Sequence, residues 1–258
     1  MDRTFRIKSV NGDTSFQHVT LKITPNVDGD YFDMQGNYLG STANSQKKIY
    51  ITGLNSFATP YSIGNIPEDF FDKQVSFTDG IGNIVNLRAG TKYGTIITAV
   101  PTDRQLIVSK KILSHYYTDA GYDVNELKYK SITQVPDKIP GGTFALARLG
   151  STSSHSEELR EGEIDISVNL LRFGSSINTG WDAINLFAHE RGQHIKDLMK
   201  YKKTLWDVFP GPYAVEHRAY MYQLNHPTWV KTSPEFKKQI WYVIGGYVHP
   251  LEYQSYFK

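Results

Sequence analysis

The chain has 258 residues and is close to neutral, with 28 basic and 26 acidic side chains and a net charge of +2. It contains eight histidines and no cysteine, which excludes disulfides, thiolate metal clusters and a cysteine nucleophile. Any metal would therefore be held by His, Asp, Glu or amide oxygen. The small net charge creates no general attraction to nucleic acid, so we expect no nucleic-acid partner.

The first hundred residues have the pattern of a β-rich region. Short apolar alternations at residues 19–23, 49–51, 75–77 and 84–87 are separated by Gly, Asn and Asp. Residues 31–40 predict a hairpin of two aromatic-bearing strands that closes on the turn Gln35-Gly36-Asn37.

The pattern changes after residue 100. Residues 104–118 predict a helix closed by Gly121, and two strands are expected at 144–147 and 163–170, the second with one apolar and one polar face. From residue 181 the pattern is mostly helical, with breaks at 210–212, 226–227 and 245–246. We therefore expect an α+β fold, with a β-rich domain at 1–100 and a second domain at 101–258.

No targeting or membrane segment is visible in the sequence. Residues 1–8 lack the apolar stretch of a secretory signal, and no run of about 18 apolar residues could cross a bilayer. We expect no membrane span and leave the location open, with export by a route that reads no N-terminal signal among the options.

The segment 183–199 carries the residues that indicate chemistry. It has helical periodicity, and His189-Glu190 lies in its middle. In a helical zinc site, two imidazoles four residues apart share one face, and a Glu beside the first activates the bound water. A third ligand is expected from a later helix, where Glu216 stands 27 residues after His189 and is followed by the small Ala219.

His189-Glu190-Arg191-Gly192 and Glu216-His217-Arg218-Ala219 together resemble the gluzincins, zinc metallopeptidases with an HExxH motif and a third ligand in an ExxA motif. The resemblance implies a zincin-like metallopeptidase domain with an active-site helix, Zn²⁺ as cofactor and Glu190 as general base. It also implies that the strand at 163–170 aligns an extended substrate, through Ile164, Ile166 and Val168.

Three further residues near Glu216 are candidates for supporting roles. Tyr213 and Tyr220 could donate a hydrogen bond to an oxyanion, although aromatic residues in a tyrosine-rich chain are more often part of the core. His217 is expected to be an outer-shell or surface residue rather than a ligand.

The sequence departs from HExxH at the second histidine, because Gln193 stands there and the histidine is displaced to His194. In one alternative His189 and His194 both ligate, as in the HExxxH motif of dipeptidyl peptidase III. Five residues advance about 500° around an ideal helix, so the imidazoles would point about 140° apart unless a π-bulge or local unwinding intervenes. That family places Gly directly before the second His, whereas Gly192 here stands two residues before His194.

In the other alternative Gln193 occupies the ligand position, because Gly192 fits the HExGH register. An amide oxygen is a poor zinc donor beside imidazole, so the protein would be a weak or inactive relative. The sequence leaves both alternatives open.

A second resemblance concerns residues 33–40. Their pattern, Asp-x-x-Gly-x-x-Leu-Gly, joined to a compact metallopeptidase-like part, is similar to the effector and toxin modules that bacteria export. This resemblance implies a secreted bacterial protein with a cognate inhibitor or immunity protein as partner.

Two hypotheses of function follow. The first is a zinc-dependent metallopeptidase-like protein that hydrolyses the amide bonds of a peptide or protein substrate through a metal-activated water and the base Glu190. The second is a catalytically impaired zincin-fold effector or binding protein that acts by protein–protein interaction.

Overall fold

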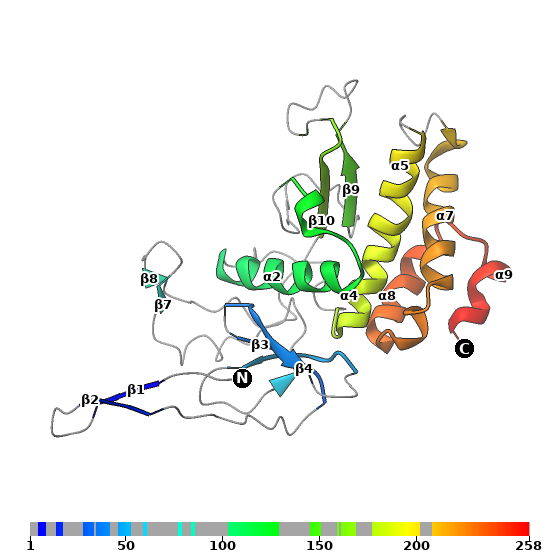
Figure 1. The fold of residues 1–258 in the computed structure, drawn as a ribbon. Coiled ribbons are helices and arrows are strands. Elements are labelled where there is room, and N and C mark those ends of the chain that lie inside the picture. The colour runs from blue at the N-terminus through cyan, green and yellow to red at the C-terminus, as the bar shows by residue number, and fades with distance from the viewer. Residues whose placement is uncertain are drawn as a thin grey trace.

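The structure is a computed structural model that describes a large part of the chain. The described residues are 5–8, 14–17, 28–33, 35–41, 46–52, 59–60, 77–78, 84–85, 103–128, 145–150, 159, 161–168, 177–201 and 208–257. Helices are combined with several small sheets (Figure 1). The mixture of α and β structure expected from the sequence is thus confirmed, whereas the strand expected at 19–23 lies outside the described residues.

Among the described residues, the strands before residue 100 form three small sheets. Strand β1 (Phe5–Lys8) pairs with β2 (Thr14–Gln17), and β7 (Phe77–Thr78) pairs with β8 (Ile84–Val85), both antiparallel. The third sheet has the order β4-β3-β5-β6, with bounds Tyr38–Ser41, Asp30–Asp33, Ile49–Thr52 and Thr59–Pro60. Strand β3 is antiparallel to β4 and parallel to β5.

The hairpin predicted at residues 31–40 is confirmed by the pairing of β3 with β4. Asp33 holds the turn, because its Oδ1 accepts the backbone N–H of Gln35 and of Asn37, each at 2.8 Å. Gly36 has a φ of +78°, and a Cβ there would stand 2.8 Å from the carbonyl oxygen of Val108. A side chain at residue 36 would therefore strain the turn and collide with the following helix.

Helix α2 (Asp103–Asp119) packs on this sheet and is followed by the short helix η1 (Val124–Glu126). It ends before Gly121, whose φ of +88° fits the predicted stop signal. One hydrophobic core contains Phe32, Ile49 and Ile51 from the sheet together with the buried residues of α2 and of the later helices. Strands from before residue 100 therefore share a core with helices after it, and the division into domains 1–100 and 101–258 stays a prediction.

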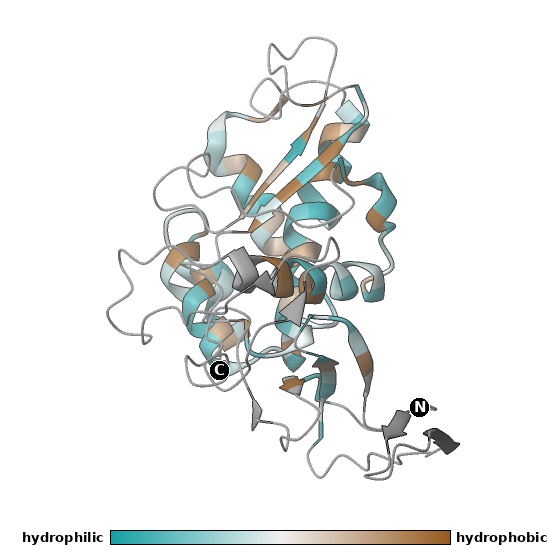
Figure 2. Ribbon diagram, turned by 90° about the vertical axis from the view of Figure 1, so that its left-hand side faces the viewer, coloured by the Kyte–Doolittle hydropathy of each residue, from teal (hydrophilic) through white to brown (hydrophobic). Residues whose placement is uncertain are grey.

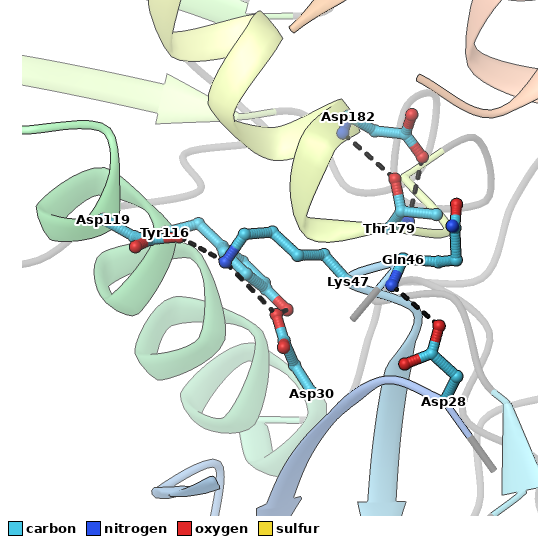
Figure 3. A network of polar contacts seen from close by, with 8 residues as sticks. All are labelled: Asp28, Asp30, Gln46, Lys47, Tyr116, Asp119, Thr179 and Asp182. Carbon is cyan, nitrogen blue, oxygen red and sulfur yellow. Dashed lines mark hydrogen bonds and ion pairs between the residues drawn. The ribbon is translucent and has the colours of Figure 1, made fainter. Parts of the chain in front are cut away.

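Lys47 connects the sheet to two helices (Figure 3). Its Nζ lies 2.6 Å from Asp119 at the end of α2 and 3.7 Å from the buried Asp30. The hydroxyl of Tyr116 also donates to Asp30, at 2.9 Å. The backbone of Lys47 has a φ of +53°, and its carbonyl accepts the N–H of Gly180 at 2.7 Å. This contact joins the sheet to the first residue of the next helix.

That helix, α4 (Gly180–His189), begins with a capping box (Figure 3). The Thr179 hydroxyl accepts the N–H of Asp182, and the Asp182 carboxylate accepts the N–H of Thr179. Asp182 is fully buried and also accepts the N–H and hydroxyl of Ser233, at 2.7 and 2.9 Å. The start of α4 is thereby fixed to Ser233, which precedes helix α8 (Pro234–Ile244).

The remaining helices follow the breaks that the sequence predicts. Helix α4 continues through η3 (Glu190–Ile195) into α5 (Lys196–Tyr201) without interruption. Helix α7 (Gly211–Asn225) lies beside this continuous helical segment (Figure 1). The chain ends with η4 (Trp229–Lys231), α8 (Pro234–Ile244), α9 (Pro250–Tyr253) and η5 (Gln254–Phe257). Hydrophobic and hydrophilic residues alternate along the helical ribbons of the molecule (Figure 2). None of the helices in the described part of the chain is long and apolar enough to span a membrane.

Strands β9 (Ala145–Leu149) and β10 (Ile164–Val168) form an antiparallel pair in which Ile166 stands opposite Ala147. The sequence predicts one polar face for β10, yet all five of its residues are buried. The buried Asp165 is compatible with this because Arg148 donates to its carboxylate, with Nε 3.1 Å from Oδ2.

Candidate metal site

The histidines of the motif lie at the junction between α4 and a π-helix. Helix α4 ends at His189, and residues Glu190–Ile195 form a six-residue π-helix before α5 begins. In a π-helix the backbone hydrogen bonds join residues five apart, so side chains at that spacing lie nearly above one another. The local structure that a ligand spacing of five requires is therefore present between His189 and His194.

Ligand atoms of three residues converge at this junction. The Nε2 atoms of His189 and His194 are 3.1 Å apart. Glu216, from α7, places Oε2 3.4 Å from Nε2 of His189 and Oε1 3.5 Å from Nε2 of His194. Within the part of the chain that the structure describes, these residues form the one group of three or more His, Asp or Glu side chains whose ligand atoms all lie within 4.8 Å of one another.

These distances fit a tetrahedral zinc ion. Zinc binds His nitrogen and carboxylate oxygen at about 2.0–2.2 Å, and tetrahedral angles then place neighbouring ligand atoms about 3.3–3.6 Å apart. The Nε2–Nε2 separation of 3.1 Å and the Nε2–oxygen separations of 3.4 and 3.5 Å, which involve different oxygens of Glu216, lie close to that range. Two imidazoles and one carboxylate also make up the donor set of catalytic zinc sites that keep a fourth position open.

Gln193 is engaged elsewhere. Its Nε2 donates to Oδ2 of Asp197 at 2.7 Å, and both residues are buried. Asp197 also accepts from Arg218 of α7, with Nε 3.2 Å from Oδ2. Gln193 thus belongs to a contact between the π-helix, α5 and α7, and of the two alternatives left open by the sequence the geometry favours His194.

The charges at the site favour a cation. Burial of the Glu216 carboxyl would raise its pKa, but the hydrogen bonds that it accepts from His189 and His194 when these imidazoles are protonated outweigh this and hold the pKa well below its usual range. Burial of His194 would lower its pKa, but the hydrogen bond with Glu216 and the charge of the Glu190 carboxyl raise it overall. The metal-free site therefore holds an ionised carboxylate and attracts positive charge, either a proton or a metal ion.

Glu190 directly follows His189 and is the first residue of the π-helix. Its side chain is buried, and this burial raises the pKa of the carboxyl, together with the nearby charge of Glu216, while His189 and His194 oppose the rise. A carboxyl whose pKa is raised toward neutrality is suited to accept and return a proton.

Tyr220 lies against the site from α7, one turn after Glu216. Its ring packs on His189 with centroids 4.6 Å apart. Burial, followed by the charges of Glu216 and Glu190, raises the pKa of the Tyr220 hydroxyl well above its usual value. Tyr220 therefore keeps its proton and stays a hydrogen-bond donor beside both carboxyls.

The other two residues considered near Glu216 lie farther out. Tyr213 is 65% exposed and contacts Tyr247, whose ring in turn stacks on Tyr220 with centroids 5.8 Å apart. The Nε2 of His217 is 2.7 Å from Oε2 of Glu252 on α9. Tyr213 thus stands at the outer end of an aromatic row that leads to the site, whereas His217 is directed to a surface contact with Glu252.

The strand assigned to substrate alignment has both edges at least partly occupied. Strand β10 pairs with β9 along one edge, and Leu127 forms a bridge with Ile164 on the other. The side chains of Ile164, Ile166 and Val168 are fully buried in the core, and β9 approaches the π-helix more extensively than β10 does. The role of β10 as the substrate edge stays a prediction.

Two further buried residues, one in contact with His189 and the other in contact with Gln223, are not singled out by the sequence. Gln223 of α7 has its Oε1 3.1 Å from Nδ1 of His189, and Asn185 lies one turn before His189 on α4. The available signal is helical spacing, since Gln223 follows Glu216 by seven residues and so shares its face. Ala219, between them and fully buried, allows the close approach of α7 that its small size predicts.

Comparison of the chain with protein-family models, curated proteins and solved structures found no match. The chemistry assigned to this site therefore depends on the geometry and the residues themselves.

Proposed function

We propose that the chain is a zinc-dependent metallopeptidase whose second half is a zincin-like domain, with His189, His194 and Glu216 as the metal ligands. The observation that carries this proposal is the convergence of His189, His194 and Glu216, whose nearest ligand atoms are 3.1–3.5 Å apart. Two histidines at a spacing of five face each other only because a π-helix intervenes, and π-helical turns occur frequently at functional sites.

A zinc ion bound by three protein ligands supplies a water with a pKa near 7 and polarises a substrate carbonyl. The chain's own residues would perform the proton transfers. The Glu190 carboxylate accepts the proton of the attacking water and returns it to the leaving amine, which its raised pKa favours. The protonated Tyr220 hydroxyl donates a hydrogen bond to the oxygen on which negative charge develops.

The substrate is a peptide or protein in an extended conformation, aligned on the β9–β10 sheet beside the π-helix by main-chain hydrogen bonds. The similarity of residues 33–40 to exported bacterial modules supports a secreted effector or toxin, with an inhibitor or immunity protein as a further partner.

The test is peptide cleavage by zinc-loaded protein, measured as new amino termini in a peptide library. Glu190→Gln keeps all three ligands and removes the base, so we expect unchanged zinc content and a loss of about 10²–10⁴-fold in rate. Glu252→Gln is the matched control, because Glu252 is an exposed carboxylate paired with His217, and we expect it to cleave like the wild type.

Two results would contradict the proposal. Cleavage by Glu190→Gln at the wild-type rate would remove Glu190 from the reaction. A zinc-loaded wild type that cleaves no peptide would favour the second hypothesis, an impaired zincin-fold effector that acts by binding.

A further inference from the structure

His189 is held from behind by a residue of the same helix that supplies Glu216. Gln223 is 1% exposed, and its Oε1 lies 3.1 Å from Nδ1 of His189. An amide oxygen only accepts hydrogen bonds, so this contact requires the proton of a neutral His189 to be on Nδ1. The lone pair of Nε2 is then directed toward His194 and Glu216.

The surroundings of Gln223 agree with this orientation of its amide. Asn185 donates its Nδ2 to the backbone carbonyl of Gln223 at 3.2 Å and to Thr228 Oγ1 at 3.1 Å. Among the described residues, the buried side-chain atoms without a hydrogen-bond partner are Gln223 Nε2 and Asn185 Oδ1, which are a donor and an acceptor. If the Gln223 amide were reversed, the two unpaired atoms would both be acceptor oxygens. The proton of His189 would then be on Nε2, the atom that must be free to bind a metal.

We propose that Gln223 is a positioning residue that fixes His189 as the Nδ1–H tautomer and aims its Nε2 at the metal; this inference rests on the proposed metal site. Helix α7 then supplies a ligand, Glu216, and two turns later the residue that orients another ligand. Partners of this kind hold the ring and raise its basicity, and their loss costs about 10–100-fold in metal affinity.

The experiment compares the wild type with Gln223→Met, which keeps the length of the side chain and removes the hydrogen bond, and with Gln223→Glu, which retains an acceptor. Gln254→Met makes the same change at an exposed position of η5 and is the control. The readouts are zinc affinity by competition with a chromophoric chelator, the visible spectrum of bound Co²⁺, and thermal unfolding of the metal-free protein.

We expect Gln223→Met to weaken zinc binding by about 10–100-fold and to change the Co²⁺ spectrum, and Gln223→Glu to restore both. A purely structural role would lower the unfolding temperature without this rescue pattern. Wild-type zinc affinity and Co²⁺ spectrum in Gln223→Met would overturn the inference and leave the metal site standing. A wild type that binds neither Zn²⁺ nor Co²⁺ would instead refute the proposed function.

A measurement on the wild type keeps the inference testable if Gln223→Met does not fold. Long-range ¹H–¹⁵N correlation spectra of the metal-free protein at mildly alkaline pH report which nitrogen of His189 carries the proton. The inference expects Nδ1–H, and a spectrum with the proton on Nε2 would overturn it.

Discussion

Replacement of Gln193 by His separates the two possible ligand registers. Gln193→His restores an HExxH pattern, so a straight α-helix would gain a ligand and bind zinc more tightly. In the structure residue 193 is directed to Asp197, and the π-helix brings His194 to Glu216 instead. We therefore expect no gain in zinc affinity from Gln193→His.

The expected magnitudes follow from the contacts that are lost. The 2.7 Å hydrogen bond from Gln193 to Asp197 lies between buried residues, and a hydrogen bond to a charged group contributes about 1.5–3 kcal/mol. We expect Gln193→His to lower the free energy of unfolding by up to that amount, since Asp197 keeps Arg218 as a partner.

His194→Ala is the complementary change, because it removes one of three protein ligands. Apparent zinc binding energies of about 10–16 kcal/mol for four-ligand sites correspond to about 3 kcal/mol per ligand, or about 10²-fold in Kd. Chelator competition measures the Kd, and urea denaturation of the metal-free variants measures stability. Tighter zinc binding by Gln193→His, with undiminished binding by His194→Ala, would refute the π-helical ligand register.

Three further predictions concern protonation and packing. Burial lowers the pKa of His194 in the metal-free protein, but its pairing with Glu216 outweighs this and raises the pKa overall. Below that pKa, zinc must displace a proton from His194. We therefore expect weaker zinc binding at lower pH, and proton release in calorimetric titrations in two buffers. Burial raises the pKa of Asp182 from its ordinary 3.8 to about 6, so between these pH values the folded state binds more protons than the unfolded state. The free energy of unfolding should therefore fall as pH rises from 3.8 to about 6, by at most about 3 kcal/mol. Denaturation of the wild type and of Asp182→Asn at several pH values measures this difference. Arg191 forms an ion pair with Glu126 through two hydrogen bonds of 2.7 and 2.8 Å, and both side chains are partly buried. A double-mutant cycle with Arg191→Met and Glu126→Gln should give a coupling energy of about 1–2 kcal/mol. A coupling energy near zero would show that this ion pair does not stabilise the π-helix.

Local sequence signals predicted the elements whose limits are set locally. The hairpin at residues 31–40 follows from its Gly turn, and α2 follows from its apolar periodicity and Gly121. The breaks between the later helices follow from Pro and Gly for the same reason. Strand β10 was predicted in position but not in burial, because the partner of Asp165 is Arg148 on another strand.

The site shows where sequence reasoning stops. The sequence spacing predicts His189 and Glu216 as metal ligands. Whether Gln193 or His194 is the third depends on whether residues 190–195 are α-helical or π-helical. Residues of the π-helix make contacts with other elements. Gln193 donates a hydrogen bond to Asp197, which also accepts from Arg218 of α7, and Arg191 pairs with Glu126. These partners lie up to 65 residues away in the chain. The local sequence therefore does not predict whether residues 190–195 form an α-helix or a π-helix.

The zinc coordination of the loaded protein tests the central claim most directly. X-ray absorption at the zinc edge, combined with metal analysis, should give about one zinc per chain, with two imidazole nitrogens and one carboxylate oxygen at about 2.0–2.2 Å. Glu216→Ala and His194→Ala should each lose most of this metal, and Gln193→Ala should retain it. A protein that retains no zinc after incubation with excess metal, or that loses it on substitution of Gln193 but not of His194, would contradict the account.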